Sequence, residues 1–153
     1  FLGPKMRETD ALVAGEESGG FAFRGHMPER AGVLSGLYIL ALMAQRGKDL
    51  PGLLDELFAK VGAHYYDRID ITMSPAERDR IAALLPSLDP RDLGGLAVLG
   101  CDRLDGLRFL LPDGQWALIR LSGTEPLMRI YTEVLEAGLV PRVLKAVRDL
   151  TGA

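Results

Sequence analysis

Hydrophobic residues recur at helical spacing in the first third of the chain. Between Glu29 and Arg46 they recur at helical spacing, which places them on one face of a helix: Val33, Leu34, Leu37, Leu40, Ala41 and Ala44. A second helix is predicted from about Leu50 to Ala63, with Asp49 as a possible cap. We expect the apolar face of the first helix to be buried.

The second half of the chain predicts a helix, several strands and a closing helix. Ser74-Pro75-Ala76-Glu77 is typical of a capping box, and the helix that it begins would end at Pro86. Strands are predicted at 95–101, 107–111, 115–121 and 127–135, with a tight turn at 112–114 and a final helix over 138–150. The segment 64–74 has the character of an extended connector.

These elements predict two parts of different class. The apolar run 11–14 predicts a buried strand, and one strand with two helices forms only a remnant of an α/β domain. The later part predicts a small α+β domain whose antiparallel sheet packs on helices. We place the first part at 1–63, the connector at 64–74 and the second part at 75–153. Because the chain opens at Phe1 without an initiator Met, we expect it to be a piece of a longer protein.

Composition excludes several classes of partner. The 153 residues are 48% hydrophobic, with a formal net charge of -3 and a pI near 5.4. There is no broad basic surface, so we expect neither nucleic acid nor a membrane as a partner. The apolar run 33–44 is too short to span a bilayer. The single cysteine, Cys101, excludes an intramolecular disulfide, and a cytoplasmic location fits best.

The stretch RLSGTEPLMR, residues 120–129, links two predicted strands with an unusual set of polar residues. Ser122 and Gly123 would suffice for a plain turn. The hydroxyls of Ser122 and Thr124 have one guanidinium group before them in the sequence and one after them, those of Arg120 and Arg129. Guanidinium forks, hydroxyls and backbone N–H groups are what a tetrahedral anion such as phosphate requires. The loop is therefore either an anion site or a decorated turn.

The stretch GEESGG, residues 15–20, has the opposite charge. Its glycines permit a sharp turn that carries Glu16, Glu17 and Ser18. Carboxylates accept hydrogen bonds from a vicinal diol, so a polyol or a metal suits this loop, and a solvated acidic turn is the simpler alternative. A metal is disfavoured because no third ligand lies at suitable spacing. An anion loop and a diol loop in one chain together suit a sugar phosphate.

These motifs resemble the α-D-phosphohexomutase family, which includes phosphoglucomutases and phosphomannomutases. GEESGG and RLSGTEP occur in the family's order, and HMPERAG, LDGLRFLLPDGQWALIRLSGTEPLMRIYTEV and the terminal helix also resemble it. The resemblance covers essentially the whole chain. It implies that 1–63 is the end of a mixed-sheet α/β/α domain, the family's third, and that 75–153 is its fourth domain.

The resemblance implies an enzyme that interconverts hexose 1-phosphates and 6-phosphates through a phosphoserine and a bisphosphorylated intermediate, assisted by Mg²⁺. The serine and the aspartates that hold Mg²⁺ belong to upstream domains, and the chain has no Ser-His-Asn and no Asp-x-Asp-x-Asp. This fragment is therefore expected to contain no catalytic residue, to bind no Mg²⁺ and to be inactive alone. The alternative is a non-catalytic phosphate-sensing or interaction module on the same fold.

The resemblance also implies roles for residues of both loops. Glu16 and Ser18 match the family's ligands of sugar hydroxyls, with Glu17 beside them. The phosphate-binding loop is matched by Arg120, Ser122, Gly123 and Thr124, and Arg129 is added from charge and proximity. The substrate partner is a phosphosugar.

Two positions depart from the family pattern. Gly20 stands where many relatives have a histidine, and Ala31 where relatives often have an aspartate. His26 is a candidate proton shuttle, although a surface or packing role is the simpler expectation. We expect Cys101 and Trp116 to be ordinary strand residues, Trp116 in the sheet core, and His64 to pack in the connector.

An incomplete first domain has a consequence for association. The apolar helix at 33–44 would lose part of the sheet that it covers, and exposed apolar surface promotes contact between copies. We expect the truncated first domain to self-associate.

Overall fold

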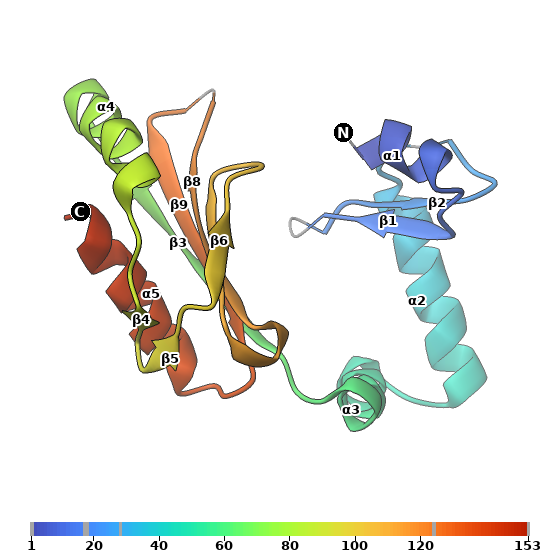
Figure 1. The fold of residues 1–153 in the computed structure, drawn as a ribbon. Helices are drawn as coiled ribbons and strands as arrows, with labels where there is room; N and C mark the ends of the chain where they lie inside the picture. The colour runs from blue at the N-terminus through green and yellow to red at the C-terminus, as the bar shows by residue number, and fades with distance from the viewer. Residues whose placement is uncertain (1, 17–18, 28, 124, 153) are drawn as a thin grey trace. The chain divides into compact units, whose positions relative to one another are not determined.

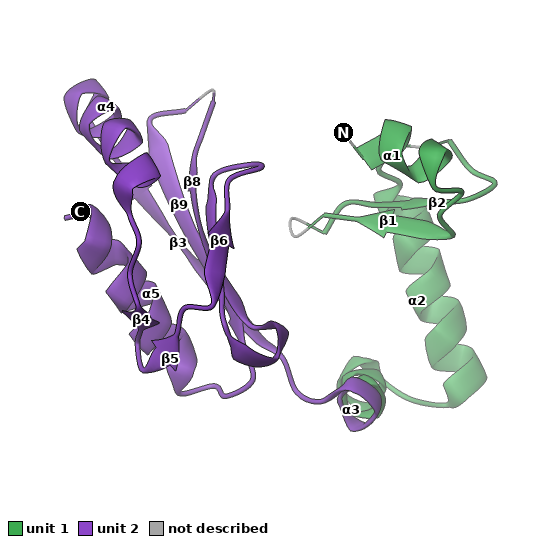
Figure 2. Ribbon diagram, in the orientation of Figure 1, with its two compact units in different colours: residues 1–57 green, residues 58–153 purple. Residues whose placement is uncertain are grey.

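The computed structural model describes residues 2–16, 19–27, 29–123 and 125–152. The chain forms two compact units, residues 1–57 and 58–153 (Figure 2).

The first unit combines a short hairpin with three helices (Figure 1). Helix α1 spans Leu2–Glu8, and strands β1 (Val13–Gly15) and β2 (Phe21–Phe23) pair antiparallel. Helix α2 spans Gly32–Arg46, and α3 spans Leu50–Val61 and crosses the division between the units. Both longer helices were predicted. Helix α1 and strand β2 were not, because they lack a long periodic pattern.

The apolar face of α2 is not buried, contrary to expectation. Among the described residues of this helix none is buried, and Val33 and Leu40 are 83% and 61% exposed. The reason is the small size of the neighbouring hairpin, which reaches the helix through a ring contact between Phe23 and Tyr38 at 4.7 Å. Strand β1 was likewise expected to be buried, but Val13 is exposed.

The second unit is an antiparallel sheet covered by helices, which confirms the predicted fold class. The sheet has the order β3-β9-β8-β7-β6. Its strands are β3 (Tyr65–Thr72), β6 (Gly100–Asp102), β7 (Leu107–Leu110), β8 (Trp116–Leu121) and β9 (Leu127–Val134). Helices α4 (Pro75–Leu84) and α5 (Leu139–Thr151) lie on the same side of the sheet (Figure 1). The short strands β4 (Asp92–Leu93) and β5 (Leu96–Ala97) pair separately, so the strand predicted at 95–101 is divided between β5 and β6.

The core lies between the sheet and these helices. Alternate residues of the central strands are fully buried there, among them Phe109, Ile119 and Ile130. Helix α5 contributes the apolar stripe expected from its sequence: Val140, Val143, Leu144 and Val147 are all buried. Trp116 does not belong to this core. It is partly buried on the opposite face, because Ala117 and Ile119 occupy the core positions of β8.

The predicted connector 64–74 contains a strand of the sheet. Strand β3 pairs with β9 along its whole length, from Tyr65 opposite Val134 to Thr72 opposite Leu127. Ile69 and Ile71 pack against the core, which accounts for their alternation with charged residues. The segment is extended, as expected, but it is an edge strand of the second unit.

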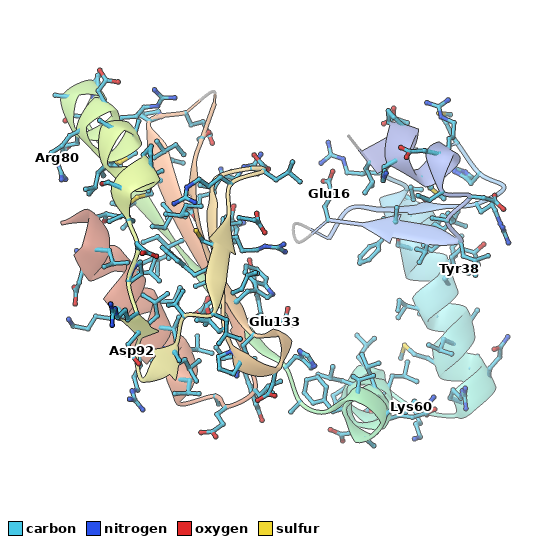
Figure 3. The ribbon with its side chains drawn as sticks, viewed as in Figure 1. Glu16, Tyr38, Lys60, Arg80, Asp92 and Glu133 are labelled. Carbon is cyan, nitrogen blue, oxygen red and sulfur yellow. The ribbon has the colours of Figure 1, made fainter. Side chains whose placement is uncertain are left out.

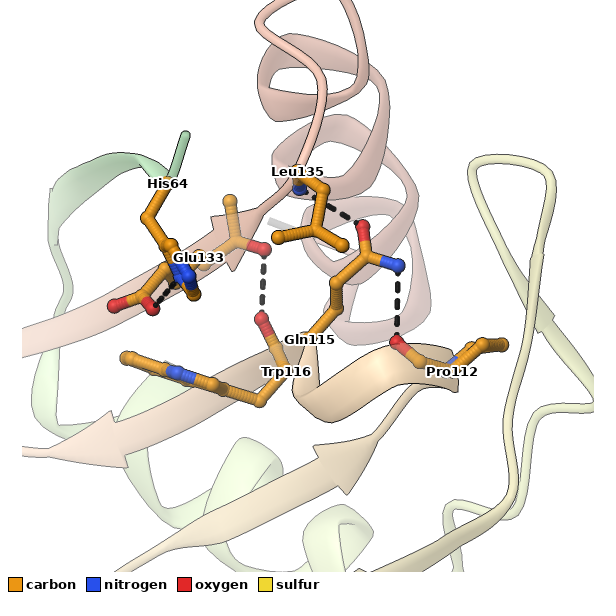
Figure 4. A network of polar contacts seen from close by, with 7 residues as sticks. His64, Pro112, Gln115, Trp116, Glu133 and Leu135 are labelled. Atoms are coloured by element: carbon orange, nitrogen blue, oxygen red, sulfur yellow. Dashed lines mark hydrogen bonds and ion pairs between the residues drawn. The ribbon is translucent and has the colours of Figure 1, made fainter. Parts of the chain in front are cut away.

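A polar network fixes the end of the sheet where β7 turns into β8 (Figure 4). The buried Gln115 side chain donates to the Pro112 carbonyl at 2.9 Å and accepts from the Leu135 N–H at 3.0 Å. The Thr132 hydroxyl donates to the Trp116 carbonyl at 2.8 Å. These bonds hold the β8–β9 hairpin, whose opposite end carries the RLSGTEP loop.

The predicted capping box of α4 is confirmed. The Ser74 N–H donates to the Glu77 carboxylate at 2.7 Å, and the Glu77 N–H donates to the Ser74 hydroxyl oxygen at 3.3 Å. The hydrogen bond from the Ser74 hydroxyl, and then that from its backbone, lowers the pKa of Glu77 below its ordinary value of 4.5.

This shift predicts the pH dependence of α4. A carboxyl group with a lowered pKa stabilises the folded state above its unfolded pKa, and the contribution is lost as the pH falls through the folded pKa. Glu77→Gln should therefore lower the melting temperature near neutral pH, and the difference from wild type should shrink as the pH falls below 4.5. Thermal unfolding between about pH 3 and 7 measures this, with Asp79→Asn on the same helix as the control. A difference independent of pH would contradict it.

In the part of the chain that the structure describes, no helix combines the length and the apolar character needed to cross a membrane.

Candidate functional site

The RLSGTEP loop joins strands β8 and β9. Its base is closed by the Ser122 N–H, which donates to the Leu127 carbonyl at 2.8 Å. The Ser122 hydroxyl oxygen accepts from the Glu125 N–H at 3.2 Å, and the residue is buried. This local bonding is typical of Ser in turns. Ser122 is therefore held at the root of the loop.

Gly123 is not required by the backbone of the loop. Its φ lies outside the left-handed region, and a Cβ built on it would meet no described atom within 4 Å. A glycine here favours ligand binding instead, because without a side chain an anion can come close to the backbone N–H groups. Thr124, the other predicted ligand in this loop, lies outside the described residues.

Arg120 and Arg129 are brought together as direct neighbours on adjacent strands. Their electrostatic surroundings differ. The Arg129 Nη2 pairs with Glu125 at 2.9 Å, and its Nε lies 3.6 Å from an Asp70 carboxylate oxygen. That Nε is buried and has no hydrogen-bond partner among the described residues. Arg129 thus already faces two carboxylates.

Arg120 is more available to an anion. Its side chain is 46% exposed and pairs through Nε with Asp105 at 3.3 Å, and Asp105 is itself 73% exposed. An exposed ion pair of this kind contributes little to stability, about 0–1 kcal/mol, and it contacts the guanidinium at Nε, so an anion can bind at the Nη groups. Arg120 is the stronger of the two arginine candidates.

The GEESGG loop connects β1 to β2. The Glu16 N–H donates to the Gly20 carbonyl at 2.9 Å, and the Gly19 N–H donates to the Glu16 carbonyl at 3.0 Å. Gly19 has a φ of 83°, in the left-handed region where glycine is favoured. Glu16 stands on this hairpin loop (Figure 3). Glu17 and Ser18 lie outside the described residues.

Arg30 is a contact of this loop that the sequence did not reveal. Its Nη1 lies 3.4 Å from the Glu16 carboxylate. The side chain crosses Gly20, where a Cβ would come within 2.3 Å of the Arg30 Cδ. Gly20, which departs from the family pattern, is thus the position that makes room for Arg30. No periodic signal in the sequence links these two residues.

A cavity of about 250 Å³ lies beside Glu16. It is lined by Leu2, Gly3, Pro4, Arg7, Glu16, Glu29 and Arg30. Two arginines and two glutamates at its wall offer both donors and acceptors to a polar guest.

The histidines and the cysteine have ordinary surroundings. His64 Nδ1 lies 2.8 Å from the Glu133 carboxylate (Figure 4). The backbone N–H of His26 donates to the Phe23 carbonyl at 3.2 Å in the turn after β2. Cys101 is a partly buried residue of β6, as expected. Its sulfur accepts a hydrogen bond from Nη1 of Arg103 at 2.9 Å. Among the described residues, no three His, Cys, Asp or Glu side chains form a group able to hold a metal ion.

Comparisons with known proteins match both units. Residues 1–61 match the family model described as phosphoglucomutase/phosphomannomutase, alpha/beta/alpha domain III, and residues 70–150 match the C-terminal domain of the same family. A Thermococcus kodakarensis protein named phosphoglucomutase/phosphomannomutase is 32% identical over 128 residues, which are 84% of this chain and 26% of the relative. A Methanococcus maripaludis phosphoglucosamine mutase is 28% identical over 141 residues, which are 92% of this chain and 30% of the relative.

Solved structures agree with these relatives. The crystal structure of a protein assigned as a phosphomannomutase from Thermus thermophilus has a TM-score of 0.75 and 33% identity, and covers 99% of this chain and 29% of that protein. A phosphoglucomutase/phosphomannomutase family protein from Burkholderia thailandensis has a TM-score of 0.67 at 25% identity, with 97% of this chain and 29% of that protein covered. The chain thus spans between a quarter and a third of the length of these proteins.

Proposed function

This chain belongs to the phosphoglucomutase/phosphomannomutase family, and from that premise we propose that it supplies sugar and phosphate contacts to a phosphohexomutase. The parent enzyme interconverts hexose 1-phosphate and hexose 6-phosphate. The observation that carries the proposal is Arg120, an exposed guanidinium beside a loop that presents a buried serine and an unobstructed glycine.

The RLSGTEP loop is the proposed grip on the phosphate that is not reacting. Arg120 provides charge, and Ser122 and the backbone N–H of Gly123 provide hydrogen bonds to phosphate oxygens. Thr124 is proposed as a further donor, and Arg129 as a weaker one because two carboxylates already face it. Contacts to a remote phosphate orient the sugar, and this binding energy favours reaction at the distant oxygen.

The GEESGG loop is the proposed contact for sugar hydroxyls. The Glu16 carboxylate accepts hydrogen bonds from hydroxyl groups, with Glu17 and Ser18 as further ligands. Arg30 orients Glu16 through their ion pair. The relatives are named for different sugars, and the proposed ligand is a phosphorylated hexose.

The chemistry of phosphoryl transfer is proposed for other parts of the parent enzyme. A Mg²⁺ ion there would neutralise charge on the transferring phosphoryl group. The described residues of this chain do not fit that ion, because no acidic cluster able to hold a metal is present among them. The proposed role of this chain is to bind and orient the substrate.

Isothermal titration of the chain with three ligands tests the proposal. Glucose 1-phosphate and inorganic phosphate should each bind weakly but more tightly than glucose, because both offer a phosphate to Arg120 and the RLSGTEP loop. Equal affinity for glucose and glucose 1-phosphate would show that the RLSGTEP loop contributes nothing.

Gly123→Ala separates binding from folding. The free energy of unfolding should change by no more than about 0.5 kcal/mol, because the new methyl group meets no described atom. Binding of glucose 1-phosphate should weaken, because the methyl group crowds the N–H groups that would contact phosphate. Titration and urea unfolding measure the two effects. Gly138→Ala is the matched control, since a Cβ there also meets no described atom; equal binding by both variants would contradict the proposed cradle.

We also propose that isolated copies of the chain associate through the first unit. Among the described residues of α2 and α3 none is buried, and Val33, Leu37, Leu40, Leu54 and Leu57 are exposed. Apolar surface of this extent favours association. Light scattering that shows only monomers over a range of concentrations would contradict this.

A further inference from the structure

The turn between β6 and β7 is pressed against the strand that carries Arg120. Gly106 has a φ of 103°, and a Cβ built on it would lie 2.3 Å from the Ile119 carbonyl oxygen and 3.3 Å from the Arg120 Cα. Only glycine allows the turn to lie this close to the backbone of β8. The consequence is that Asp105, the residue before it, stands beside the Arg120 side chain.

Asp105 contacts one edge of the guanidinium group. Its Oδ2 lies 3.3 Å from Nε of Arg120. Across the described residues the structure gives no polar partner to either Nη atom of Arg120, so the outer edge of the guanidinium retains its donors. That outer edge is the one that binds phosphate in a two-pronged arrangement.

The neighbouring arginines on the same face of the sheet contact their carboxylates through other nitrogen atoms. Arg108 on β7 gives both Nε and Nη2 to one oxygen of Asp102, at 2.7 Å and 2.5 Å. Arg129 on β9 gives Nη2 to Glu125. In both, a carboxylate takes part of the outer edge. Arg120 differs from them because its contact with a described carboxylate is made through the inner nitrogen.

We propose that Asp105 is a positioning residue for Arg120. It fixes the plane of the guanidinium through Nε and leaves both Nη groups directed to a phosphate oxygen pair. An arginine side chain loses much rotational freedom when it binds, and holding it in place beforehand reduces that loss. The Asp105 charge also repels the phosphate, so the benefit comes from the oxygen that lies beside Nε and the cost comes from the charge. This inference rests on the proposed phosphate-binding role of the loop.

Two substitutions separate the acceptor from the charge. Asp105→Asn keeps an oxygen beside the Arg120 Nε and removes the charge, so it should bind glucose 1-phosphate at least as tightly as the wild type. Asp105→Ala removes the acceptor, and it should bind about threefold to tenfold more weakly, the effect of one freed side chain. Isothermal titration of the full chain measures both. Asp102→Ala, which frees Arg108, is the control and should leave binding unchanged.

A second measurement needs no ligand. The ¹⁵N relaxation of the Arg120 Nε–H should show a more mobile side chain in Asp105→Ala than in the wild type, and little change in Asp105→Asn. The melting temperature should hardly move in either, because Asp105 is largely exposed.

Three results would overturn the inference: unchanged Arg120 mobility in Asp105→Ala, tighter binding by that variant, or the same binding change in both variants. Tighter binding by both variants would show that Asp105 acts only as a repelling charge. Failure of the phosphate site itself looks different, since it would appear as normal binding by a variant that lacks Arg120.

Discussion

Arg120→Ala is expected to weaken the binding of glucose 1-phosphate by about tenfold to a hundredfold. Hydrogen bonds to charged groups contribute about 1.5–3 kcal/mol, and each 1.4 kcal/mol is a factor of about ten in affinity. The side chain is half exposed and its described ion pair is with an exposed aspartate, so its removal should cost the fold little. Isothermal titration gives the affinity, and thermal unfolding gives the stability of the same sample.

The matched control is Arg108→Ala. Arg108 also lies on the face of the sheet opposite the core, is 49% exposed and pairs with an aspartate, but it stands on β7 opposite Leu118 and outside the RLSGTEP loop. The Arg108→Ala substitution removes the same charge from the protein as Arg120→Ala. We expect glucose 1-phosphate to bind this variant as it binds the wild type. Equal losses in both variants would mean that net charge, rather than a site at Arg120, attracts the ligand.

Phe109→Ala is expected to lower the free energy of unfolding of the second unit by about 3–5 kcal/mol. Phe109 is fully buried on β7, one strand in from the edge, in the core between the sheet and its helices. Removing the ring loses its burial and leaves a cavity that close-packed neighbours fill only in part. Urea unfolding followed by circular dichroism measures the change.

Leu110→Ala provides the comparison within the same strand. Leu110 is 39% exposed on the opposite face, so its truncation should cost about 1 kcal/mol or less. Similar costs for the two variants would show that the core does not lie on the face of the sheet assigned here.

Elements with local signals were predictable from the sequence. The capping box of α4 is formed by Ser74 and Glu77 within one turn of helix, so both partners stand in one short string. The apolar stripe of α5 has the i, i+3, i+4, i+7 spacing of one helix face, and the buried residues follow it: Val140, Val143, Leu144 and Val147. The turn at 112–114 follows from Pro112, Asp113 and Gly114, and the structure has a single 3₁₀ turn there.

Features that depend on distant partners were not predictable in the same way. Strand β3 has the pattern of an exposed extended segment, and only its pairing with β9 makes it part of the sheet. Trp116 was expected in the core because it is large and apolar, but its position in the alternation of β8 places it on the other face. The burial of α2 depends on elements that the hairpin of the first unit does not provide.

The candidate site also combines features that the sequence shows locally with features that depend on distant residues. Both loops were recognisable as strings of unusual composition. The contacts that prepare their side chains join residues far apart in the chain: Arg30 to Glu16, and Asp105 to Arg120. Gly20 and Gly106 are the positions that permit these approaches, and a glycine in a sequence does not indicate which distant group comes near it.

The most direct test of the central claim is an amide chemical-shift titration of the chain with glucose 1-phosphate, repeated on Arg120→Ala. The account predicts that the amides of Ser122 and Gly123 shift saturably in the wild type and that these shifts are lost in the variant, because the phosphate binds beside the Arg120 guanidinium. Shifts in this loop that persist without Arg120, or a loop that stays unchanged while amides elsewhere respond to the ligand, would contradict it.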